Sequence, residues 1–380
     1  MKKKLTKITG TALFSILFAY GIITHSSECT NAVRYGISTC VKTVIPSLFP
    51  FFILSGIIVD TGLAACIGKP VKRIMMTLFK TNGACASALI LGLIGGYPIG
   101  ATCAVSLYEK KLCTKTEAER LLAFCNNSGP GFTIGVAGAG VFGDVKIGIV
   151  LYGVHMISCI ITGIVFRFYK RSEKACSSHS TVPSVTCSLP SSFTSSVKSA
   201  VHSCINVSAF VVSFSVIITL LDTYNLFKPF TLLPASFSDL GRQICIGLLE
   251  VTNGLTSLAQ CSGSIPSHII ISSFLIGWAG VSVHFQTFSI INKKLSIKPY
   301  IIGKALHAVI SAIIMAIILK TNIINNSQLT FAPSIPAKSS LSFVNSGIAG
   351  AAAGAFMLLA IFLLIIFYEI SQNDWKNIRK

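Results

Sequence analysis

A run of 25 residues, Ala84 to Tyr108, is apolar enough to enter a bilayer, yet it cannot form one straight helix. Three glycines and a proline fall within Gly95–Gly100, where they remove a backbone donor and lower the helix preference. In hydrocarbon, a broken backbone is tolerated only where protein buries it or where it lines a wet cavity. The break therefore indicates either a binding site or a proline kink that serves helix packing.

The composition is that of a polytopic membrane protein. Of the 380 residues, 52% are hydrophobic and 11% are charged, and several apolar runs exceed the roughly 18 residues of a spanning helix. The net charge of +19 comes from short loops between these runs, which is typical of cytoplasmic loops and does not indicate nucleic-acid binding. Most of the thirteen cysteines lie in apolar runs without a Cys-x-x-Cys pair, so we expect no disulfide framework, metal site or cofactor.

The order of apolar and polar segments predicts five regions. They are an N-terminal transmembrane anchor with an outer loop (1–43), a first repeat (44–169), a Ser-rich cytoplasmic linker (170–199), a second repeat (200–320), and an outer loop with a last transmembrane helix and a basic tail (321–380). The first apolar run lacks a convincing cleavage site, which favours an uncleaved span over a signal peptide. Thr116-Glu117-Ala118-Glu119 has the spacing of a capping box and predicts the start of a helix.

An internal repeat is predicted at an offset of 155 residues. This shift places Leu91-Gly92-Leu93-Ile94 on Ile246-Gly247-Leu248-Leu249, and it places the apolar run 44–67 on 199–222. The late run 146–168 falls on 301–323. Residue identity is weak, so chance matching of apolar sequence is the alternative.

The distribution of lysine and arginine predicts the topology. If 84–108 and 240–261 are re-entrant hairpins, the chain has about eight full crossings, and 23 basic residues lie in cytoplasmic segments against 7 outside. Both termini are then cytoplasmic, and the two repeats are inverted. We therefore expect an all-α polytopic membrane protein with two inverted repeats, re-entrant helical hairpins and interrupted transmembrane helices, an arrangement typical of secondary transporters.

Uncharged polar residues gather at the predicted breaks, where half-helices begin near Ile99, Gly131, Leu255 and Ser282. A half-helix N-terminus suits a carboxylate or phosphate, and the nearby side chains offer donors and acceptors. The alternative is that Asn and Ser only cap the half-helices. The candidate substrate-binding residues are Gly96, Tyr97, Pro98, Gly100, Asn126, Asn127, Ser128, Gly129, Glu250, Thr252, Asn253, Gly254, Ser282, His284 and Gln286.

Ionisable residues within apolar runs are rarer and carry more information. Glu250 is a candidate for a coupling proton or cation, with a structural hydrogen bond to an opposing loop as the alternative. His284 could titrate or bind solute, or be satisfied by the backbone. Lys304 is close enough to a helix end to reach water and is set aside. His155 and His307 are expected to serve packing.

No enzyme constellation emerges from the sequence. Gly-x-Ser-x-Gly, His-Glu-x-x-His and a phosphate loop are all absent, so we expect a protein that is not an enzyme. The glycines between Gly135 and Gly143 lack the Lys-Ser/Thr of a nucleotide loop, and close helix packing explains them better.

Four motifs in order resemble the sporulation integral membrane proteins of the YlbJ family, which carry a nucleoside-recognition (Gate) domain. The motifs are Gly95-Gly96-Tyr97-Pro98-Ile99-Gly100-Ala101, Asn126-Asn127-Ser128-Gly129-Pro130, Leu249-Glu250-Val251-Thr252-Asn253-Gly254 and Gly280-Val281-Ser282-Val283-His284-Phe285-Gln286. The resemblance extends from about Ser38 to Leu319.

The resemblance implies a multi-pass protein of a spore former's cell membrane, in the outer forespore membrane, that moves dipicolinic acid. The cargo would be a small organic anion, and its aromatic ring could stack on Tyr97, Phe132 or Phe285. The expected partners are this solute, the lipid bilayer and a coupling proton or cation, without nucleic acid. The alternatives are a nucleoside or other carboxylate carrier and a membrane scaffold or signalling protein of spore formation.

Overall fold

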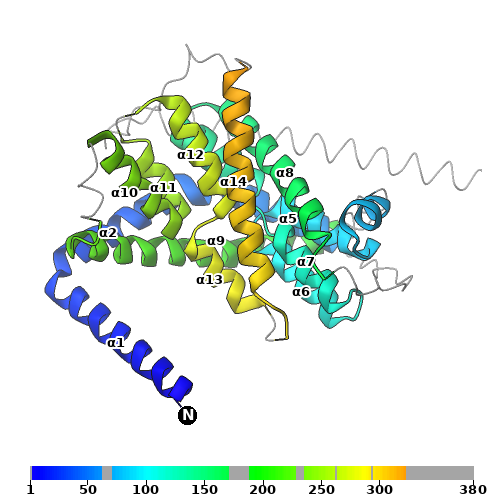
Figure 1. The fold of residues 1–380 in the computed structure, drawn as a ribbon, viewed down its shortest axis with the longest axis horizontal. Helices are drawn as coiled ribbons and strands as arrows, with labels where there is room; N and C mark the ends of the chain where they lie inside the picture. Colours follow the sequence, from blue (N-terminus) through cyan, green and yellow to red (C-terminus); the bar gives the residue numbers. More distant parts are fainter. Residues whose placement is uncertain are drawn as a thin grey trace, which may run out of the picture.

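The computed structural model describes residues 2–61, 71–170, 188–227, 235–261, 263–291 and 294–321. All regular structure in this part of the chain is helical (Figure 1). Within these described ranges, five helices are long and apolar enough to cross a membrane: Ser26–Ile58, Val145–Phe166, Leu189–Thr223, Ile265–Ile290 and Lys298–Lys320. The prediction of an all-α polytopic membrane protein is confirmed at this level, and the last transmembrane helix, predicted within 321–380, lies outside the described residues.

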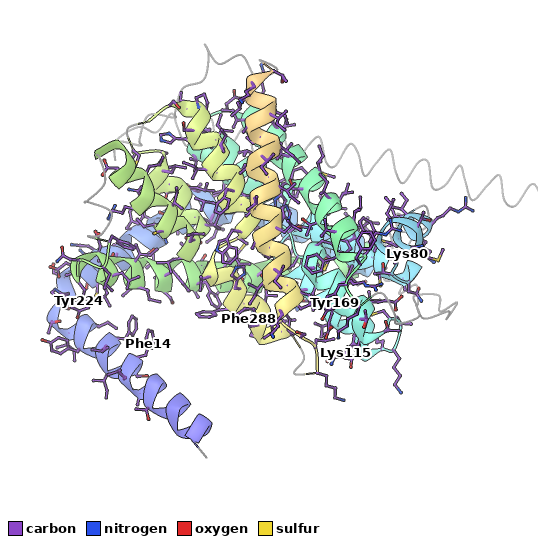
Figure 2. All side chains as sticks on the ribbon, in the orientation of Figure 1. Phe14, Lys80, Lys115, Tyr169, Tyr224 and Phe288 are labelled. Carbon is purple, nitrogen blue, oxygen red and sulfur yellow. The ribbon has the colours of Figure 1, made fainter. Side chains whose placement is uncertain are left out.

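The N-terminal helix α1 (Lys2–Thr24) stands apart from the helical body (Figure 1). Phe14, labelled in Figure 2, is 60% exposed. An apolar surface of this kind is suited to contact with lipid tails.

The predicted outer loop at 25–43 is wrong, because these residues are helical. Helix α2 (Ser26–Thr39) continues through a π-helical turn, η1 (Cys40–Val44), into α3 (Ile45–Asp60). Small buried residues at helical spacing, Cys29, Ala32 and Gly36, let this helix approach α9 (Leu189–Thr223) closely. A Cβ atom on Gly36 would lie 3.1 Å from the Cα of Val212.

Part of the predicted Ser-rich linker is also helical, since α9 begins at Leu189. Two serines at the start of α9 are small packing residues, not the residues of a flexible linker. Ser192 and Ser196 are buried, and a Cβ atom on Gly56 of α3 would lie 2.5 Å from the Oγ of Ser196. The remainder of the predicted linker, 171–187, lies outside the described residues.

Both predicted hairpins are present as helix pairs that fold back on themselves. The first joins α5 (Ala86–Gly95) to α6 (Ile99–Glu109), and a Cβ atom on Gly92 would lie 3.2 Å from the Cα of Gly100. It follows two short helices, η2 (Met75–Phe79) and η3 (Gly83–Cys85), and the chain bends by 113° between Val71–Phe79 and Gly83–Gly95.

The second hairpin joins α10 (Ala235–Leu249) to α11 (Val251–Leu258). A Cβ atom on Gly254 would collide with the Cα of Gly247, so the two helices touch through glycine backbone, as they do in the first hairpin. Small residues at such crossings allow the backbones to approach closely.

A broken helix and then a long helix follow each hairpin. In the first half these are α7 (Lys115–Cys125) with the π-helix η4 (Gly131–Phe142), and then α8 (Val145–Phe166). In the second half they are α12 (Ile265–Trp278) with α13 (Val281–Ile290), and then α14 (Lys298–Lys320). The order of long helix, hairpin, broken helix and long helix therefore occurs twice, while the inverted orientation of the two halves stays a prediction.

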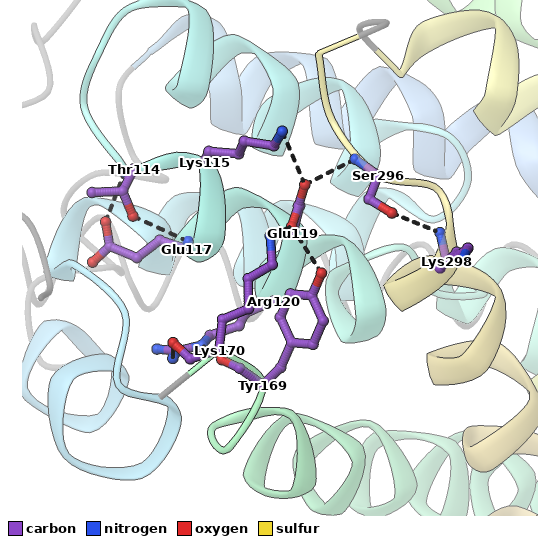
Figure 3. Close-up of polar contacts among 9 residues, drawn as sticks. All are labelled: Thr114, Lys115, Glu117, Glu119, Arg120, Tyr169, Lys170, Ser296 and Lys298. Atoms are coloured by element: carbon purple, nitrogen blue, oxygen red, sulfur yellow. Dashed lines mark hydrogen bonds and ion pairs between the residues drawn. The ribbon is translucent and has the colours of Figure 1, made fainter. Parts of the chain in front are cut away.

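The capping box of α7 lies two residues earlier than predicted. The Oγ1 of Thr114 accepts a hydrogen bond from the backbone N–H of Glu117, and the Glu117 carboxylate accepts one from the N–H of Thr114 (Figure 3). Thr114 and Thr116 are each followed three residues later by glutamate, so the spacing alone did not choose between them. The earlier register leaves Glu119 available for another role.

Glu119 joins the two halves of the chain at the base of α7. Its buried carboxylate accepts hydrogen bonds from the N–H of Ser296 at 2.9 Å and from the hydroxyl of Tyr169 at 3.0 Å (Figure 3). It also pairs with Lys170 at 3.1 Å, and this bond raises the pKa of Lys170. Desolvation and the same carboxylate raise the pKa of Tyr169.

Candidate substrate cavity between the broken helices

A cavity lies where the two hairpin tips meet the breaks in the two interrupted helices. Its empty volume is about 610 Å³, including the open mouth. Eight of the predicted site residues line it: Gly96, Tyr97, Ser128, Gly129, Glu250, Thr252, Ser282 and Gln286. The structure thus brings together residues from four segments that the sequence singled out separately.

The first hairpin tip packs directly on the break between α7 and η4. Gly96 has a φ of +75°, a conformation that L side chains rarely adopt. A Cβ atom there would lie 2.9 Å from the backbone nitrogen of Gly129. Glycine is therefore required at position 96 both for the turn and for the contact with the opposite break.

The second hairpin tip is built around one residue, Glu250, which caps α11. Its carboxylate accepts hydrogen bonds from the N–H groups of Thr252 at 3.0 Å and Asn253 at 2.7 Å. The predicted start of this half-helix near Leu255 is wrong, because the glutamate cap starts α11 at Val251. Glu250 thus makes structural hydrogen bonds, but to the start of its own helix and not to an opposing loop, and the residue also lines the cavity.

The second hairpin tip contacts the break between α12 and α13, just as the first hairpin tip contacts the break between α7 and η4. Gly280 has a φ of +84°, and a Cβ atom on it would lie 3.0 Å from the nitrogen of Val251. One carbonyl near the end of α5 and one near the end of α10 each accept a hydrogen bond from an aromatic side chain. The hydroxyl of Tyr152 donates to Leu93 O at 2.9 Å, and the indole of Trp278 donates to Leu248 O at 3.1 Å. Leu93 and Leu248 are equivalent under the 155-residue shift.

Three buried polar atoms at the cavity have no hydrogen-bond partner within the described part of the chain. They are the Oγ atoms of Ser128 and Ser282 and the Oε1 of Gln286. Buried polar atoms in proteins are almost always satisfied, so a cluster of three open ones around one space indicates a place for a polar ligand.

The walls of the cavity are aromatic, which the sequence indicated only in part. Phe51 and Phe52 on α3, Phe132 on η4 and Phe210 on α9 line it beside Tyr97. Of the three aromatic residues expected to stack on cargo, Phe285 is wrong, because its side chain is 53% exposed and lies against Phe214. The α3 and α9 phenylalanines lie in uninterrupted apolar runs, where no pattern distinguishes a cavity wall from core.

Seven predicted site residues do not line the cavity; they support the backbone around it. Gly100 and Gly254 let helices touch, and Pro98 precedes α6. Asn126 donates to the Oγ1 of Thr287 at 2.9 Å. The others are Asn127, whose amide donates to Phe124 O, Asn253, whose amide donates to Ser215, and His284, which bonds the hydroxyl of Tyr300.

His155 and His307 stack with their ring centroids 4.3 Å apart. His155 does more than pack, since its Nε2 accepts a hydrogen bond from the backbone N–H of Ser128 at 3.1 Å. One donor freed by the α7–η4 break is satisfied in this way.

Lys304 is the residue that sequence reasoning missed. It was expected to reach water from near the end of its helix, but it is 1% exposed. Its ammonium lies behind the cavity wall, 5.3 Å from the centroid of the Tyr97 ring. The sequence indicates only how close Lys304 lies to the end of its helix. It does not predict that α7 and the first hairpin tip cover this turn of α14.

The comparisons with known proteins agree with this architecture. Residues 41–166 match the family model described as Gate, nucleoside recognition. The chain is 28% identical over 334 residues to the sporulation integral membrane protein YlbJ of Bacillus subtilis (strain 168). The aligned region covers 81% of this chain and 82% of YlbJ. The chain is similar to YlbJ over most of its length. The resemblance expected from the four motifs is confirmed, and the Gate match extends from η1 to the end of α8, the first of the two repeated units.

Two solved structures of CNTnw share the fold. One, of a doubly substituted CNTnw in an outward-facing state, is 14% identical with a TM-score of 0.52 and covers 84% of this chain and 87% of that chain. The other, of CNTnw in an inward-facing substrate-bound state, is 13% identical with a TM-score of 0.52 and covers 83% and 86%.

Proposed function

We propose that this chain is a membrane transporter that carries a small aromatic organic anion, dipicolinate, through the cavity between its two hairpin tips. The observation that carries the proposal is the cluster of unpartnered polar atoms on Ser128, Ser282 and Gln286 inside an aromatic-walled space. Hydroxyl groups can donate to a carboxylate, and flat aromatic walls suit a ring.

The helix ends around the cavity contribute to recognition. The N-terminus of α13 begins at Val281, beside the unpartnered hydroxyl of Ser282, and presents backbone donors with a partial positive charge. The N-terminus of α11 differs, since the Glu250 carboxylate already occupies it. We therefore place the negative end of the cargo toward α13 and Ser128, away from Glu250.

The fold supports a mechanism of transport by alternating access. CNTnw, which shares the fold, is known in outward-facing and inward-facing states. Inverted repeats with broken helices let one element move against the other around a fixed site. In this account the two hairpins and the interrupted helices hold the cargo while the cavity opens first to one side of the membrane and then to the other. The sporulation role of YlbJ supports a position in the outer forespore membrane.

A nucleoside is the second candidate cargo, because the matched family model carries the description nucleoside recognition. A nucleoside is uncharged and would use the same hydroxyls and aromatic walls. A non-transporting scaffold or signalling protein of the spore envelope is the rival from another class.

Uptake into proteoliposomes separates these functions. We expect purified protein to move radiolabelled dipicolinate, with unlabelled dipicolinate competing and nucleosides competing weakly. Uptake of nucleoside in preference to dipicolinate would assign the second cargo. Absence of flux for every solute, with protein correctly inserted, would favour the scaffold.

A further inference from the structure

Lys304 is buried at the point where both breaks of the first half meet α14. Its ammonium donates to the backbone carbonyl of Asn126 at 3.1 Å and to the hydroxyl of Tyr97 at 3.3 Å. Asn126 follows the last residue of α7, and Tyr97 lies between α5 and α6. One side chain from the second half therefore bridges two backbone breaks of the first.

This ammonium has no carboxylate partner in the part of the chain that the structure describes, where the ion pairs lie at other residues. The titratable side chain in contact with it is the phenol of Tyr97, from the hairpin tip. Two thiols and three imidazoles interact with it electrostatically without a contact: Cys125 from α7, His155 and Cys159 from α8, His284 from α13 and His307 from α14. Within the described residues, the amine is in contact with a backbone carbonyl, a phenol hydroxyl and the face of the Tyr97 ring.

A buried, unpaired ammonium in a membrane protein is costly and marks a functional position. In secondary transporters, the carbonyls freed where helices unwind coordinate the coupling cation. Asn126 O is such a carbonyl, and the covalently attached amine of Lys304 already donates a hydrogen bond to it.

We propose that Lys304 is a resident cation that takes the place of a dissociable coupling ion between the two breaks. Transport through the cavity is then independent of sodium and other metal cations. The expected effect on solute flux rests on the proposed transport function. The cation site itself can be tested without any substrate.

The substrate-free test compares thermal unfolding of purified wild type, Lys304→Ala and Lys304→Arg in equal concentrations of sodium, methylammonium and choline chloride. Sodium and methylammonium are small enough to enter the space that the alanine variant opens, and choline is not. We expect the melting temperature of wild type and Lys304→Arg to be the same in all three salts. Lys304→Ala should melt several degrees higher in sodium or methylammonium than in choline. Stabilisation of wild type by sodium, or indifference of Lys304→Ala to all three salts, would overturn the proposal.

The flux test uses dipicolinate uptake in the same salts. Wild-type uptake should vary by less than twofold among them. Uptake by Lys304→Ala in choline should fall at least tenfold and recover in part with methylammonium. If the alanine variant does not purify, Lys304→Gln keeps a donor near Asn126 O without the charge and should show the same tenfold loss. Wild-type rates for either variant in choline, or a sodium requirement of the wild type, would contradict the inference. A wild type that carries no solute but shows the expected melting pattern would reject the transport function and leave the cation site in place.

Discussion

Gly96→Ala is expected to abolish solute uptake and to lower the free energy of unfolding by about 2–4 kcal/mol. Alanine would have to adopt the φ of +75° that glycine adopts here, and its Cβ would lie 2.9 Å from the nitrogen of Gly129. Both effects push the first hairpin tip away from the α7–η4 break. Because Tyr97 and Ser128 flank this contact and line the cavity, the cavity loses one of its walls.

The matched control for this substitution is Gly153→Ala on α8. A Cβ atom on Gly153 meets nothing within 4 Å, and the residue lies inside a helix. Alanine should therefore leave uptake unchanged and stabilise the helix by roughly 0.5–1 kcal/mol. Unfolding in detergent and uptake in proteoliposomes measure both quantities. Equal behaviour of the two variants would show that the contact between tip and break is not required.

Glu119→Gln is expected to destabilise the protein by about 3 kcal/mol. The carboxylate is fully buried and accepts from Ser296 and Tyr169 while it pairs with Lys170. A glutamine offers one acceptor oxygen, and its amide donors would face the N–H of Ser296 or the ammonium of Lys170. The loop before α14 would then lose its attachment to α7 (Figure 3).

Chemical unfolding of purified protein tests this prediction, with Glu28→Gln as the control. Glu28 is exposed on α2, so its substitution should change stability by less than about 0.5 kcal/mol. A Glu119→Gln protein as stable as the control would mean that the cluster at the base of α7 does not join the two halves.

The backbone breaks could be predicted from sequence because glycine and proline carry local information. Gly96 and Pro98 forced the first hairpin tip, and Gly280 marked the break between α12 and α13. The break predicted over Glu250–Gly254 is limited to Glu250, and the helix α11 begins at the next residue. The Glu250 carboxylate accepts hydrogen bonds from the N–H groups that a longer break would have exposed.

The predictions that the structure contradicts concern features that depend on tertiary packing. The serines at 192 and 196 were interpreted as linker, but they are buried against α3 and belong to a helix. Lys304 is buried only because residues more than a hundred positions away cover it, which no local pattern in α14 encodes. The aromatic wall from Phe51 and Phe210 likewise follows from the packing of α3 beside α9.

Equilibrium binding of dipicolinate to the purified protein tests the central claim most directly, because that claim assigns the cargo to the unpartnered hydroxyls between the two breaks. We expect wild type to bind, and the double variant Ser128→Ala with Ser282→Ala to bind at least about a hundredfold more weakly, since each of the two lost hydrogen bonds to a carboxylate is worth about 1.5–3 kcal/mol. Ser195→Ala, an exposed position on α9, should bind as wild type does. Unchanged affinity in the double variant would contradict the account.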